Sequence, residues 1–310
     1  MLETVKQPSR EILLSVVIST RDRPNQVDLA TKSVLEQLPK NCELIIVDQS
    51  ANEDTATALS RYKLDDRFTY IRSCRNGVSA GRNEGIRRAG SKWIFITDDD
   101  CELFPNTFAK VIEVIEFNHD IGIVFGNVFA GPYDPSTGII PTYFRKRQFL
   151  ARTINDKMNV EGLSACMVIR KHVWENLNGF DELLGAGAPL RSGAETDFTM
   201  RSLLAGYSVL ETPQIRIIHH GFRTWEQSHV LASRYWFGSG AAFARCLSGG
   251  NFAVCILISR LFFRWIVGGR SHTAISLGRR RRDLRCVLWF TQGFFSAIKM
   301  RSFPKEMNPV

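Results

Sequence analysis

Residues 77–100 read GVSAGRNEGIRRAGSKWIFITDDD, in which a short apolar run is followed by three consecutive aspartates. Glycines 77 and 90 enclose a predicted helix, and residues 93–96 predict a buried strand that leads directly into the aspartates. Helices that alternate with continuous apolar strands are typical of a sheet covered by helices. This stretch therefore indicates an α/β fold in which acidic side chains follow the end of a strand.

The same alternation continues on both sides of this stretch. Before it, strands are predicted at 13–19, 44–47 and 68–71, with helices at 25–38 and 55–62. After it, helices are predicted at 107–118 and 198–205, and strands at 121–124, 167–169 and 215–218. Residues 131–143, rich in glycine, proline and tyrosine, are interpreted as a surface excursion. The pattern predicts a Rossmann-like, mostly parallel sheet with helices on both faces and ligands at the carboxyl ends of its strands.

The composition is that of an ordinary globular enzyme. The 310 residues are 44% hydrophobic and 23% charged, which excludes the disordered, collagen-like and coiled-coil classes. The seven cysteines have no C-x-x-C spacing and are interpreted as reduced. The first apolar run is preceded by acidic residues and resembles a short strand rather than a signal-peptide core, so a cytoplasmic location is expected.

The excess positive charge lies in the last third of the chain. Residues 221–310 contain 14 Lys or Arg against 3 Asp or Glu, and residues 1–220 contain 26 against 28, so the net charges are +11 and −2. Arginines 260, 264 and 279–282 alternate with aromatic residues, a pattern that favours helices at the inner face of an anionic membrane. A packed helical appendage with a solvated basic rim is the alternative. No nucleic-acid partner is expected, because no such binding module is recognisable.

Three adjacent carboxylates at the end of a strand need a positive partner. A divalent cation such as Mg²⁺ or Mn²⁺, bound to two phosphates, meets this need because it prefers oxygen ligands. On an extended segment Asp98 and Asp100 would point to one side and Asp99 to the other. The sequence thus predicts a metal and phosphate site at Asp98 and Asp100, with a solvated acidic turn as the alternative.

Four segments of the chain resemble successive blocks of the family 2 glycosyltransferases. They are SVVISTRDRPNQVDLATKSVLEQ (15–37), LIIVDQSANEDT (44–55), NGVSAGRNEGIRRAGSKWIFITDDD (76–100) and MVIRKHVWENLNGFDELLG (167–185). The resemblance implies a GT-A fold, an inverting displacement and a metal-bound nucleotide diphosphate sugar. It divides the chain into a GT-A domain at 1–221, with a donor half at about 12–105 and an acceptor half at about 106–221, and a helical basic extension at 222–310.

The resemblance also implies roles for individual donor-site residues. The loop after the first strand contacts the nucleoside, an acidic residue after the second strand binds base or ribose, an Arg-Asn pair lies near the nucleotide, and a D-x-D pair binds donor and metal. In this sequence these positions are Thr20, Asp22, Asp48, Arg82, Asn83, Asp98 and Asp100, with Asp100 as the direct metal ligand. Gln49 stands where the family has a second Asp, so the base and the sugar are not identified.

A general base is expected near the start of the helix that ends at Gly206. An inverting transfer needs a carboxylate to take the proton of the acceptor hydroxyl. The resemblance sets Glu195 at the base position, although Ala194 replaces the family's first acid, and Asp197 is the alternative base. The family's final strand ends in a histidine that matches His219, a further metal ligand, with His220 as the alternate.

These features predict a metal-dependent inverting glycosyltransferase. It would move a sugar from a nucleotide diphosphate sugar to a hydroxyl of a saccharide or lipid-linked glycan. A nucleotidyltransferase is a rival, but residues 20–26, TRDRPNQ, lack the glycines of its phosphate loop. A non-catalytic nucleotide-binding module that docks on membranes is a second rival, and it would bind nucleotide without turnover.

Overall fold

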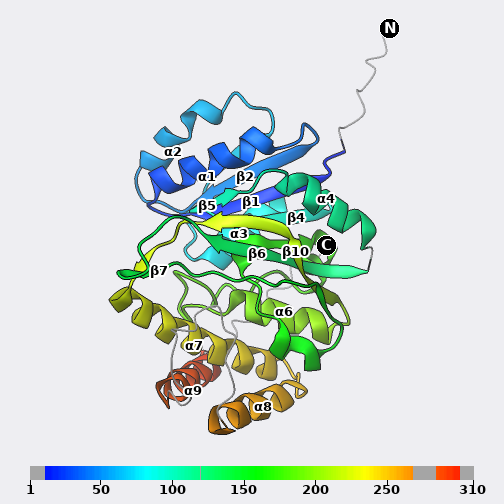
Figure 1. The fold of residues 1–310 in the computed structure, drawn as a ribbon, viewed down its shortest axis with the longest axis vertical. Coiled ribbons are helices and arrows are strands. Elements are labelled where there is room, and N and C mark those ends of the chain that lie inside the picture. The colour runs from blue at the N-terminus through cyan, green and yellow to red at the C-terminus, as the bar shows by residue number, and fades with distance from the viewer. Residues whose placement is uncertain (1–10, 119, 268–283, 301–310) are drawn as a thin grey trace.

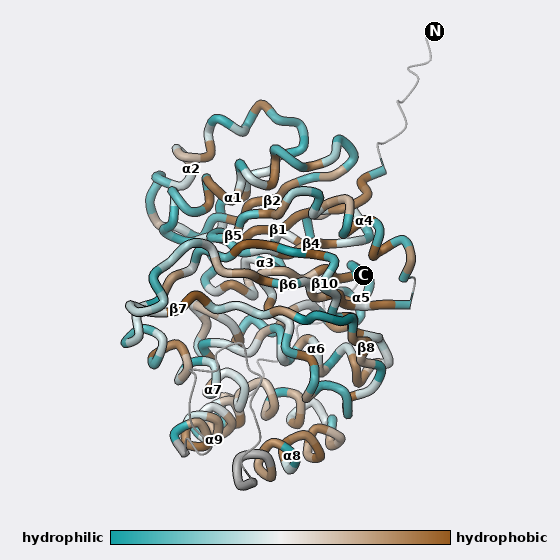
Figure 2. Tube along the Cα trace, in the orientation of Figure 1, coloured by the Kyte–Doolittle hydropathy of each residue, from teal (hydrophilic) through white to brown (hydrophobic). Residues whose placement is uncertain are grey.

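The computed structural model describes residues 11–118, 120–267 and 284–300 (Figure 1). One sheet crosses the middle of the molecule in the order β3-β2-β1-β4-β9-β6-β10-β5, and β8 pairs with β10. Helices α1, α2 and α4 lie on one side of the sheet, and α6 and α7 lie on the other (Figure 1). The central strands are its most continuous apolar segments (Figure 2). The α/β architecture is therefore confirmed.

The first four predicted strands form the parallel half of the sheet. They are β1 (Leu14–Thr20), β2 (Cys42–Asp48), β3 (Phe68–Arg72) and β4 (Trp93–Asp98). Because β1 lies between β2 and β4, Thr20 is level with Asp48, and Ser19 is level with Asp98. The carboxyl ends of these strands thus bring three predicted site residues to one edge.

The other half of the sheet is mixed. Strand β9 (Met167–Arg170) is antiparallel to β4 and β6 (Ile121–Ala130), and β10 (Ser208–His219) is parallel to β6. Strands β5 (Cys101–Leu103) and β8 (Phe149–Ala151) join β10 antiparallel. Only two residues separate β4 from β5, too few for the crossover that a parallel connection needs. This short turn sets Cys101 opposite His219, beside the aspartates.

The helices follow the predicted order with shifted ends. Helices α1 (Pro24–Gln37) and α4 (Thr107–Phe117) pack on one face, while α3 (Val78–Arg88), α5 (Lys171–Asn176) and α6 (Ala194–Leu204) pack on the other. The predicted helix at 55–62 is divided into α2 (Asp54–Ala58) and a 3₁₀ turn. Helix α6 begins four residues earlier than predicted, so both candidate bases lie in its first turn.

The segment at 131–143 is better anchored than a surface excursion would be. It contains β7 (Gly138–Ile139), which pairs antiparallel with β11 (Arg223–Thr224). Tyr143 is buried, bridges to Val128 of β6 and donates a 2.9 Å hydrogen bond to Glu211. The sequence of this segment, rich in turn-forming residues, did not predict these contacts, because each contact is made with a segment that is distant along the chain.

The last helices share the core of the α/β unit. They are α7 (Trp225–Ser248), α8 (Val254–Val267) and α9 (Leu284–Lys299). Phe237 of α7 and Phe290 of α9 belong to the same apolar cluster as Val17 and Ile96 of the central sheet. The hydrophobic core therefore does not divide at residue 221, where the sequence suggested a boundary.

Helices α7 and α9 cross at two glycines. A Cβ on Gly240 would lie 1.9 Å from the carbonyl oxygen of Phe290, and one on Gly293 would lie 1.8 Å from that of Phe237. At both points the nearest atoms of the other helix are backbone atoms, so rotation of a side chain cannot make room for an added Cβ.

We predict that Gly293→Ala lowers the free energy of unfolding by about 1–3 kcal/mol, the usual cost of overpacking. The sign of this change in the free energy of unfolding is informative, because alanine in a helix normally stabilises a protein by about 1 kcal/mol relative to glycine. Chemical denaturation measures the change, with Gln292→Ala at the exposed neighbouring position as the control. A stabilised Gly293→Ala variant would contradict the close crossing.

Candidate functional site

The three aspartates form a turn rather than an extended segment. Strand β4 ends at Asp98, whose carboxylate accepts a 2.8 Å hydrogen bond from Arg82. Asp99 and Asp100 both face Arg23, one on each guanidinium nitrogen. The expected alternation, with Asp99 turned away from a shared side of Asp98 and Asp100, is therefore wrong, because the chain turns at Asp99.

Arg23 compensates the buried charge of this turn. Burial raises the pKa of Asp99 to about 6, although Arg23 and a 2.7 Å hydrogen bond from the Thr20 hydroxyl oppose the shift. Burial also disfavours the Asp100 carboxylate, but His219 and Arg23 together hold its pKa well below the ordinary value. Asp100 thus stays ionised. Sequence reasoning missed Arg23, although its place in the loop after the first strand could have suggested it.

His219 has the orientation of a metal ligand. Its Nδ1 lies 3.0 Å from the carbonyl oxygen of Pro141, and its Nε2 lies 3.2 Å from the Asp100 carboxylate. A ring nitrogen that donates to a backbone carbonyl fixes the orientation of the ring, so that the other nitrogen, here turned to Asp100, can bind a cation once it has lost its proton. Burial disfavours the imidazolium, but the neighbouring Asp100 carboxylate raises the His219 pKa overall. His220 instead lies 3.1 Å from Glu102, so His219 is the residue that faces Asp100.

The surroundings of Asp100 and His219 fit a hard divalent cation. A Cβ on Gly221 would lie 2.6 Å from His219 Nε2 and 2.9 Å from Asp100 Oδ2, so the glycine keeps this space clear. Ligand atoms of Asp100, Cys101 and His219 lie within 4.8 Å of one another. Burial, and then the charges of nearby aspartates, raises the pKa of the Cys101 thiol well above its ordinary value. A neutral thiol is a poor ligand for Mg²⁺ or Mn²⁺, which leaves the carboxylate and the imidazole.

The predicted nucleoside contacts differ in accessibility. Asp22 has an exposed carboxylate, and its N–H donates a 2.8 Å hydrogen bond to the Ser50 hydroxyl. Asp48 is fully buried. Its carboxylate accepts hydrogen bonds from the Tyr70 hydroxyl at 2.7 Å and from the Ser50 N–H at 2.9 Å, and lies 3.6 Å from Arg72. Asp22 is therefore open to a ligand, whereas Asp48 is occupied by protein contacts.

Asn83 is likewise fully engaged inside the protein. Its amide nitrogen donates to the Phe180 carbonyl at 2.9 Å and to Glu182 at 3.0 Å. Its oxygen accepts from the Phe180 N–H and the Trp174 indole, both at 2.9 Å. The side chain is buried, so this geometry does not support the predicted donor contact. Asn83 instead fastens the segment before α6 to α3.

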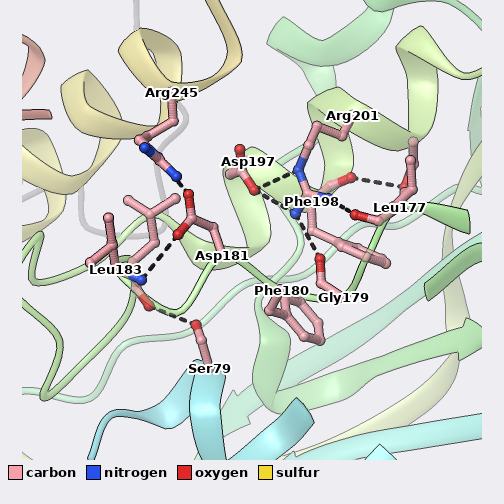
Figure 3. A network of polar contacts seen from close by, with 12 residues as sticks. Ser79, Leu177, Gly179, Phe180, Asp181, Leu183, Asp197, Phe198, Arg201 and Arg245 are labelled. Atoms are coloured by element: carbon pink, nitrogen blue, oxygen red, sulfur yellow. Dashed lines mark hydrogen bonds and ion pairs between the residues drawn. The ribbon is translucent and has the colours of Figure 1, made fainter. Parts of the chain in front are cut away.

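Asp197 belongs to a buried network that fixes the start of α6 (Figure 3). Arg201 donates to its carboxylate at 2.8 and 2.6 Å, and also to the carbonyl oxygens of Leu177 and Gly179. Burial raises the pKa of Asp197, and Arg201 opposes the shift. This carboxylate is enclosed, which disfavours a role in proton transfer.

Glu195 is the open carboxylate of this turn. It is half-buried and has no hydrogen bond or ion pair with any residue that the structure describes. Its charge acts on the Tyr235 hydroxyl of α7, as do those of Asp98 and Asp100. The candidate base and the acidic turn thus both act electrostatically on this side chain. Sequence reasoning missed Tyr235, because the resemblance ends before α7.

Comparisons with known proteins identify the family and the fold of this chain. The model of glycosyl transferase family 2 matches residues 15–175, which is just over half of the chain. A Campylobacter jejuni GalNAc(5)-diNAcBac-PP-undecaprenol beta-1,3-glucosyltransferase is 29% identical over 117 residues, 37% of this chain and 37% of that protein. An O-antigen biosynthesis protein of Myxococcus xanthus is 31% identical over 251 residues, 74% of this chain but 19% of the relative. The chain therefore spans only a minor part of these relatives.

Two solved structures share the fold. One is a mannosyltransferase from Pyrobaculum calidifontis in complex with GDP-Man and Mn²⁺, with a TM-score of 0.60, 16% identity, and coverage of 96% of this chain and 78% of that one. The other is S. aureus TarS in complex with UDP-GlcNAc, with a TM-score of 0.54, 15% identity, and coverage of 74% and 66%. At such identities the likeness carries the fold alone.

We predict that Asp100→Ala abolishes Mn²⁺-dependent binding of nucleoside diphosphate. His219→Ala should weaken Mn²⁺ binding by about tenfold or more, the scale on which metal sites lose affinity when a supporting group is removed. Paramagnetic resonance titration of Mn²⁺ with UDP and with GDP measures both effects. Cys101→Ser is the matched control and should change the affinity by less than about twofold, because a buried neutral thiol is not a ligand here. Loss of binding in Cys101→Ser alone would overturn the ligand assignment.

Proposed function

The chain belongs to glycosyltransferase family 2 and has the GT-A fold, and from this premise we propose that it transfers a sugar from a nucleotide diphosphate sugar to an acceptor hydroxyl, with inversion at the anomeric carbon. The observation that carries the proposal is the pairing of Asp100 with His219, 3.2 Å apart beside Gly221, together with a Glu195 carboxylate that no described residue binds. A free carboxylate and a cation-binding carboxylate near one point are what an inverting displacement requires.

The donor binds at the carboxyl edge of β1, β2 and β4. The open Asp22 carboxylate and the Thr20 loop contact the nucleoside, and Asp98, oriented by Arg82, faces the sugar-phosphate side. Asp48 contributes indirectly by fixing Ser50, which in turn holds the backbone of Asp22. Asp100 and His219 would hold Mn²⁺ or Mg²⁺, which when bound neutralises the diphosphate leaving group.

Glu195 acts as the general base. A carboxylate oxygen of Glu195 takes the proton of the acceptor hydroxyl. At the same time the hydroxyl oxygen of the acceptor attacks the anomeric carbon. The bond from the anomeric carbon to the diphosphate oxygen breaks, and its electron pair leaves with the nucleoside diphosphate. The Asp197–Arg201 pair stabilises the first turn of α6, which carries Glu195, and does not touch the substrate.

The acceptor is proposed to be a saccharide of the cell envelope, carried on a lipid or on a growing glycan. The name of the Campylobacter relative includes an undecaprenol diphosphate acceptor, and that of the Myxococcus relative refers to O-antigen biosynthesis. A lipid-linked acceptor lies at a membrane surface, and the C-terminal helices have an exposed apolar face that suits contact with such a surface.

We therefore propose that α8 and α9 attach the protein peripherally to the inner face of an anionic membrane. Neither helix contains an acidic residue. Large apolar side chains point outward from this region: Phe252, Ile256, Phe263, Leu288, Phe295 and Ile298, with Phe252 74% exposed and Phe263 65% exposed. Within the described ranges, no helix has the length and apolar character that a membrane crossing demands. Exposed aromatic side chains on a basic region favour insertion at the headgroup level.

We predict that Glu195→Gln binds the donor normally but transfers sugar about 100-fold or more slowly, because the amide keeps the shape and removes the basicity. Isothermal titration with nucleotide sugars and release of nucleoside diphosphate measure the two quantities. Asp197→Asn should lower the melting temperature, since it breaks a buried ion pair, while the folded protein keeps most of its rate. If Asp197→Asn abolishes transfer and Glu195→Gln retains it, the base has been misassigned.

For the membrane face we predict sedimentation with vesicles that contain phosphatidylglycerol, and none with pure phosphatidylcholine. Added salt should weaken the attachment but not abolish it, because inserted aromatic side chains are not screened. The double variant Phe263→Glu with Phe295→Glu should stay in the supernatant. Leu64→Glu is the control, since Leu64 is 95% exposed but lies outside α8 and α9. Equal sedimentation of the double variant and the control would contradict this face.

A further inference from the structure

Tyr235 lies on the face of α7 that packs toward the α/β unit. Ser228 and Ala232 are buried on that face, and Tyr235 follows Ala232 by three residues, so the three share one side of the helix. Its ring is half-buried. The tyrosine therefore carries a polar hydroxyl into a region that is otherwise lined by small side chains of α7.

Contacts at two points fix this part of α7 relative to the site. Before the helix, Gly221 lies against His219 and Asp100, and the Trp225 indole donates a 2.9 Å hydrogen bond to Ser136. Further along, a Cβ on Gly193 would lie 2.4 Å from the carbonyl oxygen of Gly238, so α7 touches the residue that caps α6. Tyr235 lies between these two points, one turn before Gly238.

The electrostatic surroundings of the Tyr235 hydroxyl agree with this position. Burial, and then the charges of Glu195, Asp98 and Asp100, raises its pKa, while Arg223 opposes the shift. The phenol therefore stays protonated and is a hydrogen-bond donor. Yet in the described part of the chain the hydroxyl has no acceptor. A half-buried donor of this kind is well placed to bind an oxygen atom of a ligand.

The carboxylates that act on this hydroxyl, and the packing of α7 against the start of α6, indicate the class of that ligand. In an inverting displacement the transferred sugar stands between the leaving diphosphate, held near Asp98 and Asp100, and the acceptor hydroxyl at the general base, Glu195. Building on the function proposed above, we propose that the Tyr235 hydroxyl donates a hydrogen bond to a hydroxyl oxygen of the transferred sugar and thereby selects sugars that carry a hydroxyl at that position. Sites that hydrogen-bond a substrate hydroxyl discriminate strongly against analogues that lack it.

The test compares binding of nucleoside diphosphates with binding of their sugar conjugates. Isothermal titration in Mn²⁺ would use UDP, GDP, UDP-glucose, UDP-N-acetylglucosamine and GDP-mannose. Tyr235→Phe should bind the nucleoside diphosphate like the wild type but bind the matching sugar conjugate about tenfold more weakly, the scale of one hydrogen bond. If Tyr235 had a purely structural role, the substitution would not selectively reduce the affinity that the sugar adds to that of the nucleoside diphosphate. Tyr207→Phe is the control, because that hydroxyl binds Asn176 elsewhere on the surface.

Deoxy derivatives of the accepted donor provide a second measurement that does not depend on how the variant folds. One deoxy donor should bind the wild type about tenfold more weakly, and Tyr235→Phe should show no loss with that same donor. Unchanged binding of every sugar conjugate by Tyr235→Phe would overturn the inference and leave the proposed transfer intact. Failure of the wild type to bind any of these nucleotide sugars would overturn both.

Discussion

The structure depends on how three adjacent aspartates are neutralised at the end of one buried strand. Arg82 forms an ion pair with Asp98, and Arg23 forms ion pairs with both Asp99 and Asp100. The side chains of these last two aspartates are almost completely buried, so removing their counter-charges would leave carboxylates uncompensated in a medium of low polarizability. This turn also directs β5 across to β10, which places His219 beside Asp100. Charge compensation and strand connection thus create the cation site together.

The second constraint is that the C-terminal helices pack directly against the part of the α/β unit that carries the proposed site. Helix α7 contacts α6 through the backbones at Gly193 and Gly238, and it is itself held by α9 through paired glycines. The apolar core runs without a break from the central sheet to Phe290. A membrane surface that binds α8 and α9 would therefore be connected through packed helices to Tyr235 and the first turn of α6. Such a connection suits an enzyme whose acceptor is presented at the same surface.

The first strands of the sheet and the position of the acidic turn could be predicted from the sequence, because both follow from local patterns of apolar and charged residues. Buried strands are continuous apolar runs, so β1 to β4 and the acidic turn were located correctly. What the sequence could not reveal depends on contacts between distant segments. Asn83 was predicted to touch the donor, but it binds Phe180 and Trp174, which lie 97 and 91 residues away along the chain. Tyr235 shows no local motif, and its position follows only from the packing of α7.

In the proposed reaction this site displaces a nucleoside diphosphate from a sugar in a single inverting step. The most direct measurement is proton NMR of the sugar released during slow hydrolysis of UDP-glucose, UDP-N-acetylglucosamine or GDP-mannose in Mn²⁺, recorded before the anomers equilibrate. Each of these sugars is α-linked, and water can take the place of the acceptor hydroxyl at Glu195. The account predicts that the β anomer appears first, together with nucleoside diphosphate. Initial release of the α anomer, or of sugar phosphate with nucleoside monophosphate, would contradict it.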